Sequence, residues 1–176
     1  MLDPSETRPP AKFLEAFGWL AIRWSGLELM IEISCAYIFQ NKIVVDNRGA
    51  PPRPFRSRIK FVRKGLRHPA FAHIRYDFER ALQTAESLAD ERNDLMHGAF
   101  TRWTGSDDPI QTVVRSYDFG YIASEDKAVS IAELDDLATR IGTAFFVHFN
   151  LIDRFKAILR AIDGEEDLGR RMIGGE

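Results

Sequence analysis

The sequence is poor in cysteine, since Cys35 is the only one among its 176 residues. A disulfide within the chain is therefore excluded, and with it the class of small secreted domains that depend on such bridges. Cys35 lies among apolar neighbours, which is typical of a small core residue. A single cysteine suits a reducing compartment, so we expect a cytoplasmic protein. The length of 176 residues, 45% of them hydrophobic, is enough for one domain with a full hydrophobic core.

Long hydrophobic runs are also missing. No segment approaches the roughly 18 consecutive apolar residues that a membrane-spanning helix needs, so we expect no membrane partner. The first residues, MLDPSETRPPAK, lack a cationic start followed by an apolar run, and therefore do not resemble a secretory signal. Their three prolines predict a flexible N-terminal arm over residues 1–11.

The chain has no large excess of charge of one sign, because its 24 Lys and Arg nearly balance its 26 Asp and Glu and leave a net charge of −2. Between Arg53 and Arg80, however, nine Lys and Arg stand against two acids, a local balance of +7 that leaves −9 for the rest of the chain. One interpretation is a solvated helix surface. The other is a phosphate-binding patch, whose candidate residues are Arg56, Arg58, Lys60, Arg63, Lys64 and Arg67.

Apolar residues recur at steps of three and four along most of the chain, which predicts amphipathic helices. The expected helices cover residues 13–40, 57–67, 70 or 74 to 97, and 130–162. Ser130 and Glu133 match the S-x-x-E capping box that opens the last of them. Prolines between residues 51 and 54 end any helix there, and Pro69 is a breaker or a first-turn residue.

The periodicity changes after Gly98, where turn chemistry in GSDDP separates two strand-like segments. We expect a small β-hairpin over 99–117, pairing 99–104 with 110–117. The fold class predicted is all-α: an antiparallel four-helix bundle with this hairpin inserted between helices three and four. A single domain would span residues 12–163, and residues 164–176 would form a frayed tail.

The segment ADERNDLMHGAF, residues 89–100, carries the chemistry. Arg92 occupies an apolar-stripe position, where a charge needs a partner or a wet cleft. Asn93 and His97 are four residues apart and share a helix face, whereas His97 lies about 140° around the helix from Arg92. A histidine at a helix C-terminus favours its cationic form. Arginine can hold a phosphate while histidine transfers a proton, which suits RNA cleavage without a metal or cofactor.

At Arg92, Asn93, His97 and Gly98 the chain resembles the HEPN superfamily, whose motif is Arg, four to six residues, then His, with Asn often after the Arg. This resemblance implies an α-helical bundle, usually a homodimer with two motifs facing a shared cleft. It also implies a metal-independent endoribonuclease that cleaves RNA by 2′-OH attack. Such proteins often act as toxins, with an antitoxin-type partner, or in phage defence. The hairpin departs from a minimal family bundle, and some members have lost catalysis.

Several alternatives remain open. Arg92 could pair with Glu28 or Glu32 while His97 only caps its helix, which would favour a non-catalytic interaction or scaffold module. Asp94 and His97 have the carboxylate-x-x-His spacing of di-iron bundles, but only one copy is present. His68 and His73 lack partners at zinc-ligand spacing. His148 is either a core histidine or a cleft residue. Trp103, with Phe100, Arg102 and Tyr117, could pack in the hairpin or stack on a base.

Overall fold

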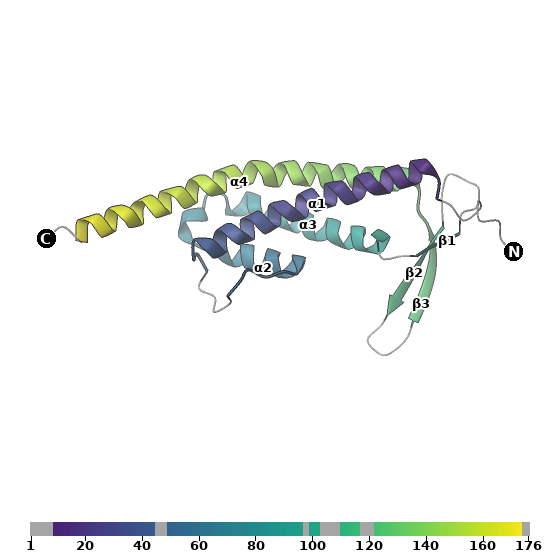
Figure 1. Cartoon of the computed structure of the whole chain (residues 1–176), viewed down its shortest axis with the longest axis horizontal. Helices are drawn as coiled ribbons and strands as arrows, with labels where there is room; N and C mark the ends of the chain where they lie inside the picture. Colours follow the sequence, from purple (N-terminus) through teal and green to yellow (C-terminus); the bar gives the residue numbers. More distant parts are fainter. Residues whose placement is uncertain (1–8, 45–48, 97–98, 103–109, 117–121, 174–176) are drawn as a thin grey trace. The chain divides into compact units, whose positions relative to one another are not determined.

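The computed structural model describes residues 9–44, 49–96, 99–102, 110–116 and 122–173. Most of this chain forms four helices (Figure 1), which confirms the helix count expected from periodicity. Their bounds are α1 (Ala11–Gln40), α2 (Phe55–Gly65), α3 (Arg75–Met96) and α4 (Ile131–Ile173). Most of the predicted N-terminal arm lies outside the described residues.

Two compact units divide the described chain. The first combines Met1–Ser25 with Glu86–Gly142, and the second combines Gly26–Ala85 with Thr143–Glu176. Helices α1, α3 and α4 each contribute residues to both units, so the single domain expected over 12–163 stays a prediction. The two units are described in turn.

Aromatic rings from two parts of the chain form the core of the second unit. Phe71 stacks on Phe155 with ring centres 4.6 Å apart, and Phe78 lies 5.6 Å from the same Phe155 ring. Phe71 belongs to a 3-10 turn, Pro69–Phe71, whose N-cap His68 accepts a hydrogen bond from the Ala70 amide. Pro69 is thus a first-turn residue, as predicted. Apolar side chains from α1 and α2 complete this core: Leu27, Ile31, Cys35, Ile38, Ile59, Val62 and Leu66.

Helix direction in the second unit departs from the expected alternation. Arg63 pairs with Glu79, and Arg75 reaches the Leu66 carbonyl, so α2 and α3 run antiparallel. Helices α1 and α2 run the same way instead, because Arg58 meets Glu28 while Gly65 faces Ile38 ten residues further along α1. The connection over 41–54 is long enough, at roughly 3.3 Å per extended residue, to lead the chain back before α2 begins.

Gly65 allows α2 to approach α1 closely. A Cβ atom at this position would lie 2.5 Å from Ile38 Cδ1, well inside van der Waals contact. Helix α1 then ends beside this contact in a Schellman-type cap: the Ile43 amide donates to the Ile38 carbonyl at 3.1 Å, and the Lys42 amide donates to the Phe39 carbonyl at 3.2 Å. Lys42 adopts φ +52°, the left-handed conformation usually taken by glycine at this position.

In the first unit, the start of α4 follows the sequence prediction closely. The Ser130 amide donates to Glu133 Oε2 at 2.8 Å, and the Glu133 amide donates to Ser130 Oγ at 3.1 Å. The predicted capping box is therefore confirmed. Helices α3 and α4 run antiparallel here, because Glu91 pairs with Arg140 while Leu95, further along α3, lines a groove with Glu133, earlier on α4.

The segment between α3 and α4 forms a three-stranded antiparallel sheet in the order β1-β2-β3. Its strands are β1 (Ala99–Arg102), β2 (Ile110–Ser116) and β3 (Ile122–Ala128). A two-stranded hairpin over 99–117 is therefore not seen as such, since β2 also pairs with β3 in the register Val113 with Glu125. Sequence analysis missed β3 because IASEDKA is rich in charged residues, which are depleted in strands.

The C-terminal boundary of α4 was also wrong in the sequence prediction. The helix continues to Ile173, although a frayed tail was expected from residue 164. Gly164 costs a helix interior only about 1 kcal/mol relative to alanine and does not by itself end a helix. No helix in the described part of the chain is both long and apolar enough to span a membrane.

Candidate functional site

The last turns of α3 hold Arg92, the arginine that interrupts the apolar stripe. Its guanidinium carbon lies 5.4 Å from the centre of the Trp24 ring on α1, which is a cation–π arrangement. Nη1 donates a 3.0 Å hydrogen bond to Oδ1 of the neighbouring Asn93. Trp24 is 5% exposed, so the flat indole forms a floor under the half-buried arginine. This contact explains how a stripe position accommodates a charged residue.

Arg92 keeps its charge without a carboxylate partner among the residues that the structure describes. Its Nε atom is buried and has no hydrogen-bond partner. A buried donor without a partner costs about 1–3 kcal/mol, so this arrangement is unfavourable for folding alone. Glu28 and Glu32, which the sequence offered as partners for Arg92, both pair with Arg58 within the second unit.

His97 lies outside the described residues, as does Gly98. The cooperation of His97 with Arg92 therefore stays a prediction. Asn93 is exposed, and its Oδ1 accepts a hydrogen bond from Arg92. Its expected role beside His97 stays a prediction.

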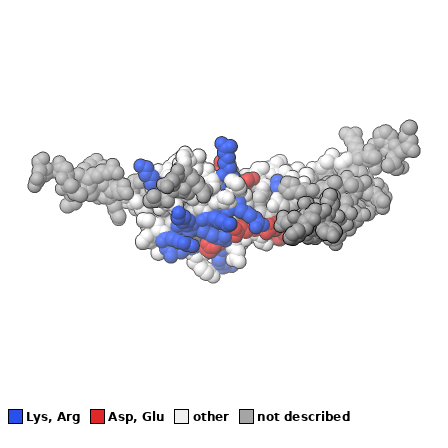
Figure 2. Space-filling model, turned by 90° about the horizontal axis from the view of Figure 1, so that it is seen from below, with Lys and Arg blue, Asp and Glu red and all other residues white. Residues whose placement is uncertain are grey.

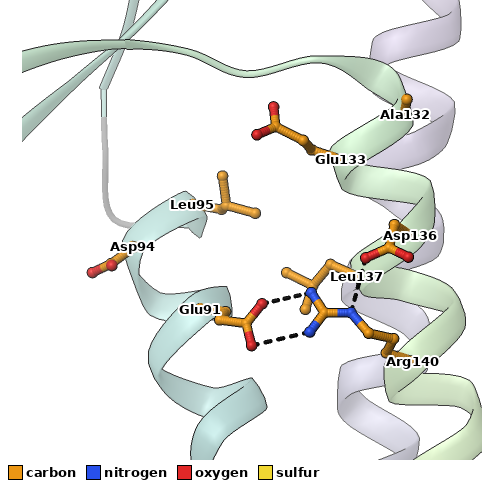
Figure 3. Close-up of a pocket in the computed structure, with 8 residues that line it drawn as sticks. All are labelled: Glu91, Asp94, Leu95, Ala132, Glu133, Asp136, Leu137 and Arg140. Atoms are coloured by element: carbon orange, nitrogen blue, oxygen red, sulfur yellow. Dashed lines mark hydrogen bonds and ion pairs between the residues drawn. The ribbon is translucent and has the colours of Figure 1, made fainter.

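A groove of about 410 Å³ opens beside the same turns of α3, between α3 and the start of α4 (Figure 3). Arg140 spans it, donating to both Glu91 carboxylate oxygens at 3.1 and 2.5 Å and to Asp136 at 2.9 Å. The Glu91 hydrogen bond is the main cause that raises the pKa of Arg140 above its usual value. The groove is lined by Glu91, Asp94, Leu95, Ala132, Glu133, Asp136, Leu137 and Arg140.

Four carboxylates against one arginine make this groove acidic. Such a surface repels a phosphate backbone, so the groove is unsuited to RNA. Asp94, the carboxylate of the di-iron alternative, lines the groove. No group of three or more metal-ligating side chains occurs among the described residues.

The second candidate surface is the exposed face of α2. Arg56, Lys60 and Lys64 are exposed and spaced by four residues, so they follow one face of the helix. Arg67 is exposed just beyond the helix end. Basic side chains gather on the face of the molecule shown in Figure 2, with acidic ones beside them. We call Arg56, Lys60, Lys64 and Arg67 the α2 ridge.

Two of the six predicted phosphate-binding residues are engaged elsewhere. Arg58 is 14% exposed, with Nη1 3.4 Å from Glu28 Oε1 and Nη2 3.3 Å from Glu32 Oε2. Arg63 Nε donates to Glu79 Oε1 at 2.6 Å. The structure therefore assigns Arg58 to a contact between α1 and α2, whereas the residues of the α2 ridge have exposed side chains.

The remaining histidines differ in environment. His148 is fully buried on α4, with Nδ1 3.0 Å from the Ala144 carbonyl and its ring edge-on to Phe78 at 6.1 Å. Burial lowers the pKa of His148, and the Ala144 hydrogen bond opposes this effect. The core interpretation of His148 is thus confirmed. His68 caps the 3-10 turn, whereas Trp103 and Tyr117 lie outside the described residues.

Trp24 is the site residue that sequence analysis missed. Its place in the apolar stripe of α1 indicated only a core residue, and no sequence pattern links it to Arg92. Only the two stripes taken together indicate the contact. An arginine in one apolar stripe and a tryptophan in another can form a cation–π contact if the two helices pack together.

Comparisons with models of known protein families, with curated proteins and with solved structures find no significant match to this chain.

Proposed function

We propose that this protein is a metal-independent endoribonuclease of HEPN type. Arg92 binds the scissile phosphate, His97 transfers the proton, and Asn93 orients Arg92. The observation that carries the proposal is the state of Arg92: a half-buried guanidinium, braced by Trp24 and Asn93 and not neutralised by a described carboxylate. A cation kept in this state has donors left for an anionic ligand.

The reaction needs little beyond these groups. His97 takes the proton of a ribose 2′-OH, and the freed oxygen attacks the adjacent phosphorus atom. The bond from phosphorus to the 5′-oxygen breaks, and that oxygen receives a proton. The products are a 2′,3′-cyclic phosphate and a 5′-hydroxyl end. Arg92 stabilises the negative charge that builds up on the phosphorus oxygens, which is the role that a metal has in other nucleases.

RNA binding draws on the α2 ridge. Lys60 and Lys64 are exposed and contact no carboxylate among the described residues, so they can neutralise phosphates. The acidic groove between α3 and α4, in the first unit, repels phosphate groups and is not part of this surface. The family resemblance adds a homodimer, an antitoxin-type partner and a role in phage defence to this proposal.

The test is cleavage of total RNA in EDTA by the wild type, Arg92→Ala and His97→Ala. We expect cleavage by the wild type and loss by about 100-fold or more in each variant. Arg80→Ala is the matched control, because Arg80 is an exposed arginine on the same helix whose contact is with the Tyr76 ring. Far-UV circular dichroism verifies that all four proteins are folded. Undiminished cleavage by both site variants would refute the assignment of Arg92 and His97.

One observation favours a non-catalytic interaction module instead. Within the second unit, Leu29, Phe146 and Phe149 are 50%, 64% and 49% exposed. Large apolar side chains that are exposed to solvent can mark a contact with another protein. Absence of RNA cleavage by the folded wild type, together with stable binding to a protein partner, would favour this second function.

A further inference from the structure

A second hollow, between the C-terminal end of α1 and α4, has a different chemistry from the acidic groove. It has a volume of about 260 Å³ and lies wholly in the second unit. Its lining residues are Tyr37, Gln40, Asn41, Lys156, Leu159 and Arg160. These are two cations, two amides, an aromatic ring and one aliphatic side chain, and none of the lining residues whose side chains are described is a carboxylate. We call this the α1–α4 hollow.

Lys156 and Arg160, the two cations of this hollow, can both donate hydrogen bonds to an anion. Lys156 and Arg160 are four residues apart on α4 and share a helix face. Lys156 Nζ lies 5.7 Å from the centre of the Tyr37 ring. The carboxylate closest to it, on Asp153, is 3.9 Å away and 71% exposed, so that contact contributes little in water. Arg160 is exposed, and no ion pair joins it to a carboxylate on α1 or on α4 up to residue 162.

The C-terminal end of α1 repels a negative ligand less than a helix end with unpaired carbonyl groups would. Unpaired carbonyls make that end of a helix negative. Here the Asn41 amide and its Nδ2 both donate to the Tyr37 carbonyl, at 3.0 and 2.8 Å. The Schellman-type cap at Lys42 and Ile43 occupies the next two carbonyls. The carbonyls of Tyr37, Ile38 and Phe39 are therefore all satisfied by hydrogen bonds at this end of α1.

We propose that the α1–α4 hollow binds a phosphate monoester attached to a nucleoside. Lys156 and Arg160 hold the phosphate, while Tyr37 and the Gln40 amide contact the nucleoside. Two cations suit a monoester better than a backbone diester, because a monoester carries about −1.5 to −2 charges at pH 7 and a diester carries one. Either a free mononucleotide or the 5′-phosphate end of an RNA strand has this group. The RNA source rests on the proposed function, whereas the mononucleotide source does not.

Binding of 2′-O-methyl oligonucleotides tests the proposal without interference from cleavage, because the attacking oxygen is blocked. Fluorescence anisotropy compares 3′-labelled strands that end in a 5′-phosphate or a 5′-hydroxyl. Calorimetry compares uridine 5′-monophosphate with uridine. We expect the phosphorylated form to bind about tenfold more tightly in at least one of these pairs, as two charge-assisted contacts imply.

The double variant Lys156→Gln/Arg160→Gln should lose this preference. Arg154→Gln is the matched control, because Arg154 is on the same helix but pairs with Asp77, and it should retain the preference. Preference for the mononucleotide with no binding of any strand would support the hollow while refuting the proposed function. Equal binding of phosphorylated and unphosphorylated ligands in both pairs by the wild type would overturn the proposal. A preference that survives in the double variant would overturn it as well.

Discussion

Arg92 on α3 lies over the ring of Trp24 on α1, with 5.4 Å between the guanidinium carbon and the ring centre. The contact lies within the first unit and joins a charged residue to a buried aromatic floor. The Trp24 ring orients the guanidinium but does not neutralise its charge, whereas a carboxylate partner would neutralise it. Arg92 is therefore placed for a ligand at some expense to folding, a common property of functional residues.

Replacing Arg92 by methionine tests this balance. Methionine keeps the packing against Trp24 but removes the buried Nε that has no partner. We expect the free energy of unfolding to stay unchanged or to rise by about 1 kcal/mol, because the cost of an unsatisfied donor disappears. Urea denaturation provides the measurement. A decrease of about 2 kcal/mol or more would show that Arg92 has a structural role.

The contact of Arg58 with Glu28 and Glu32 should behave in the opposite way. In Arg58→Met, two carboxylates on α1 lose their shared cation, so we expect the free energy of unfolding to fall by about 1–2 kcal/mol, a value reduced for the solvent exposure of both carboxylates. Lys60→Met, two residues further along on the exposed face of α2, should change it by less than about 0.5 kcal/mol. Similar values for the two variants in thermal or urea denaturation would contradict the contact.

Salt dependence of RNA binding separates the α2 ridge from the rest of the basic segment. In Lys60→Gln/Lys64→Gln, two phosphate contacts are lost, which should reduce the slope of log K against log salt by about 1.4 for single-stranded RNA. Arg154→Gln serves as the control with the same type of charge loss elsewhere in the second unit. A slope equal to that of the wild type would remove the ridge from the RNA-binding surface.

His148 should make stability depend on pH. Burial lowers its pKa in the folded state below the usual 6.5. As the pH falls below 6.5, the unfolded chain binds a proton that the folded chain does not, so stability is full above this pH and is lost towards the folded pKa. His148→Leu removes this effect. We expect the wild type to lose more stability than the variant between pH 7.5 and pH 5.5, by up to about 1.4 kcal/mol per pH unit. Parallel losses in urea denaturation would show that His148 does not titrate in this way.

Features that depend on near neighbours in the chain were predicted well from sequence. The four helices follow from apolar spacing, and the Ser130 and Glu133 cap follows from residues three apart. Errors arose where a local pattern was weak, as in the charged strand β3, or was overridden, as at Gly164. Helices and their caps are predictable because they depend on hydrogen bonds between backbone groups that lie close together in the sequence.

Partnerships between distant side chains needed the tertiary structure. Sequence showed that Arg92 required an explanation, but only the folded chain assigned Trp24 to it and gave Glu28 and Glu32 to Arg58. It likewise separated Arg58 and Arg63 from the exposed cations of the α2 ridge. Arginine has a long side chain with several donors, so its partner depends on which helices pack beside it. Helix packing and direction are set by the whole core, and no short segment of sequence contains that information.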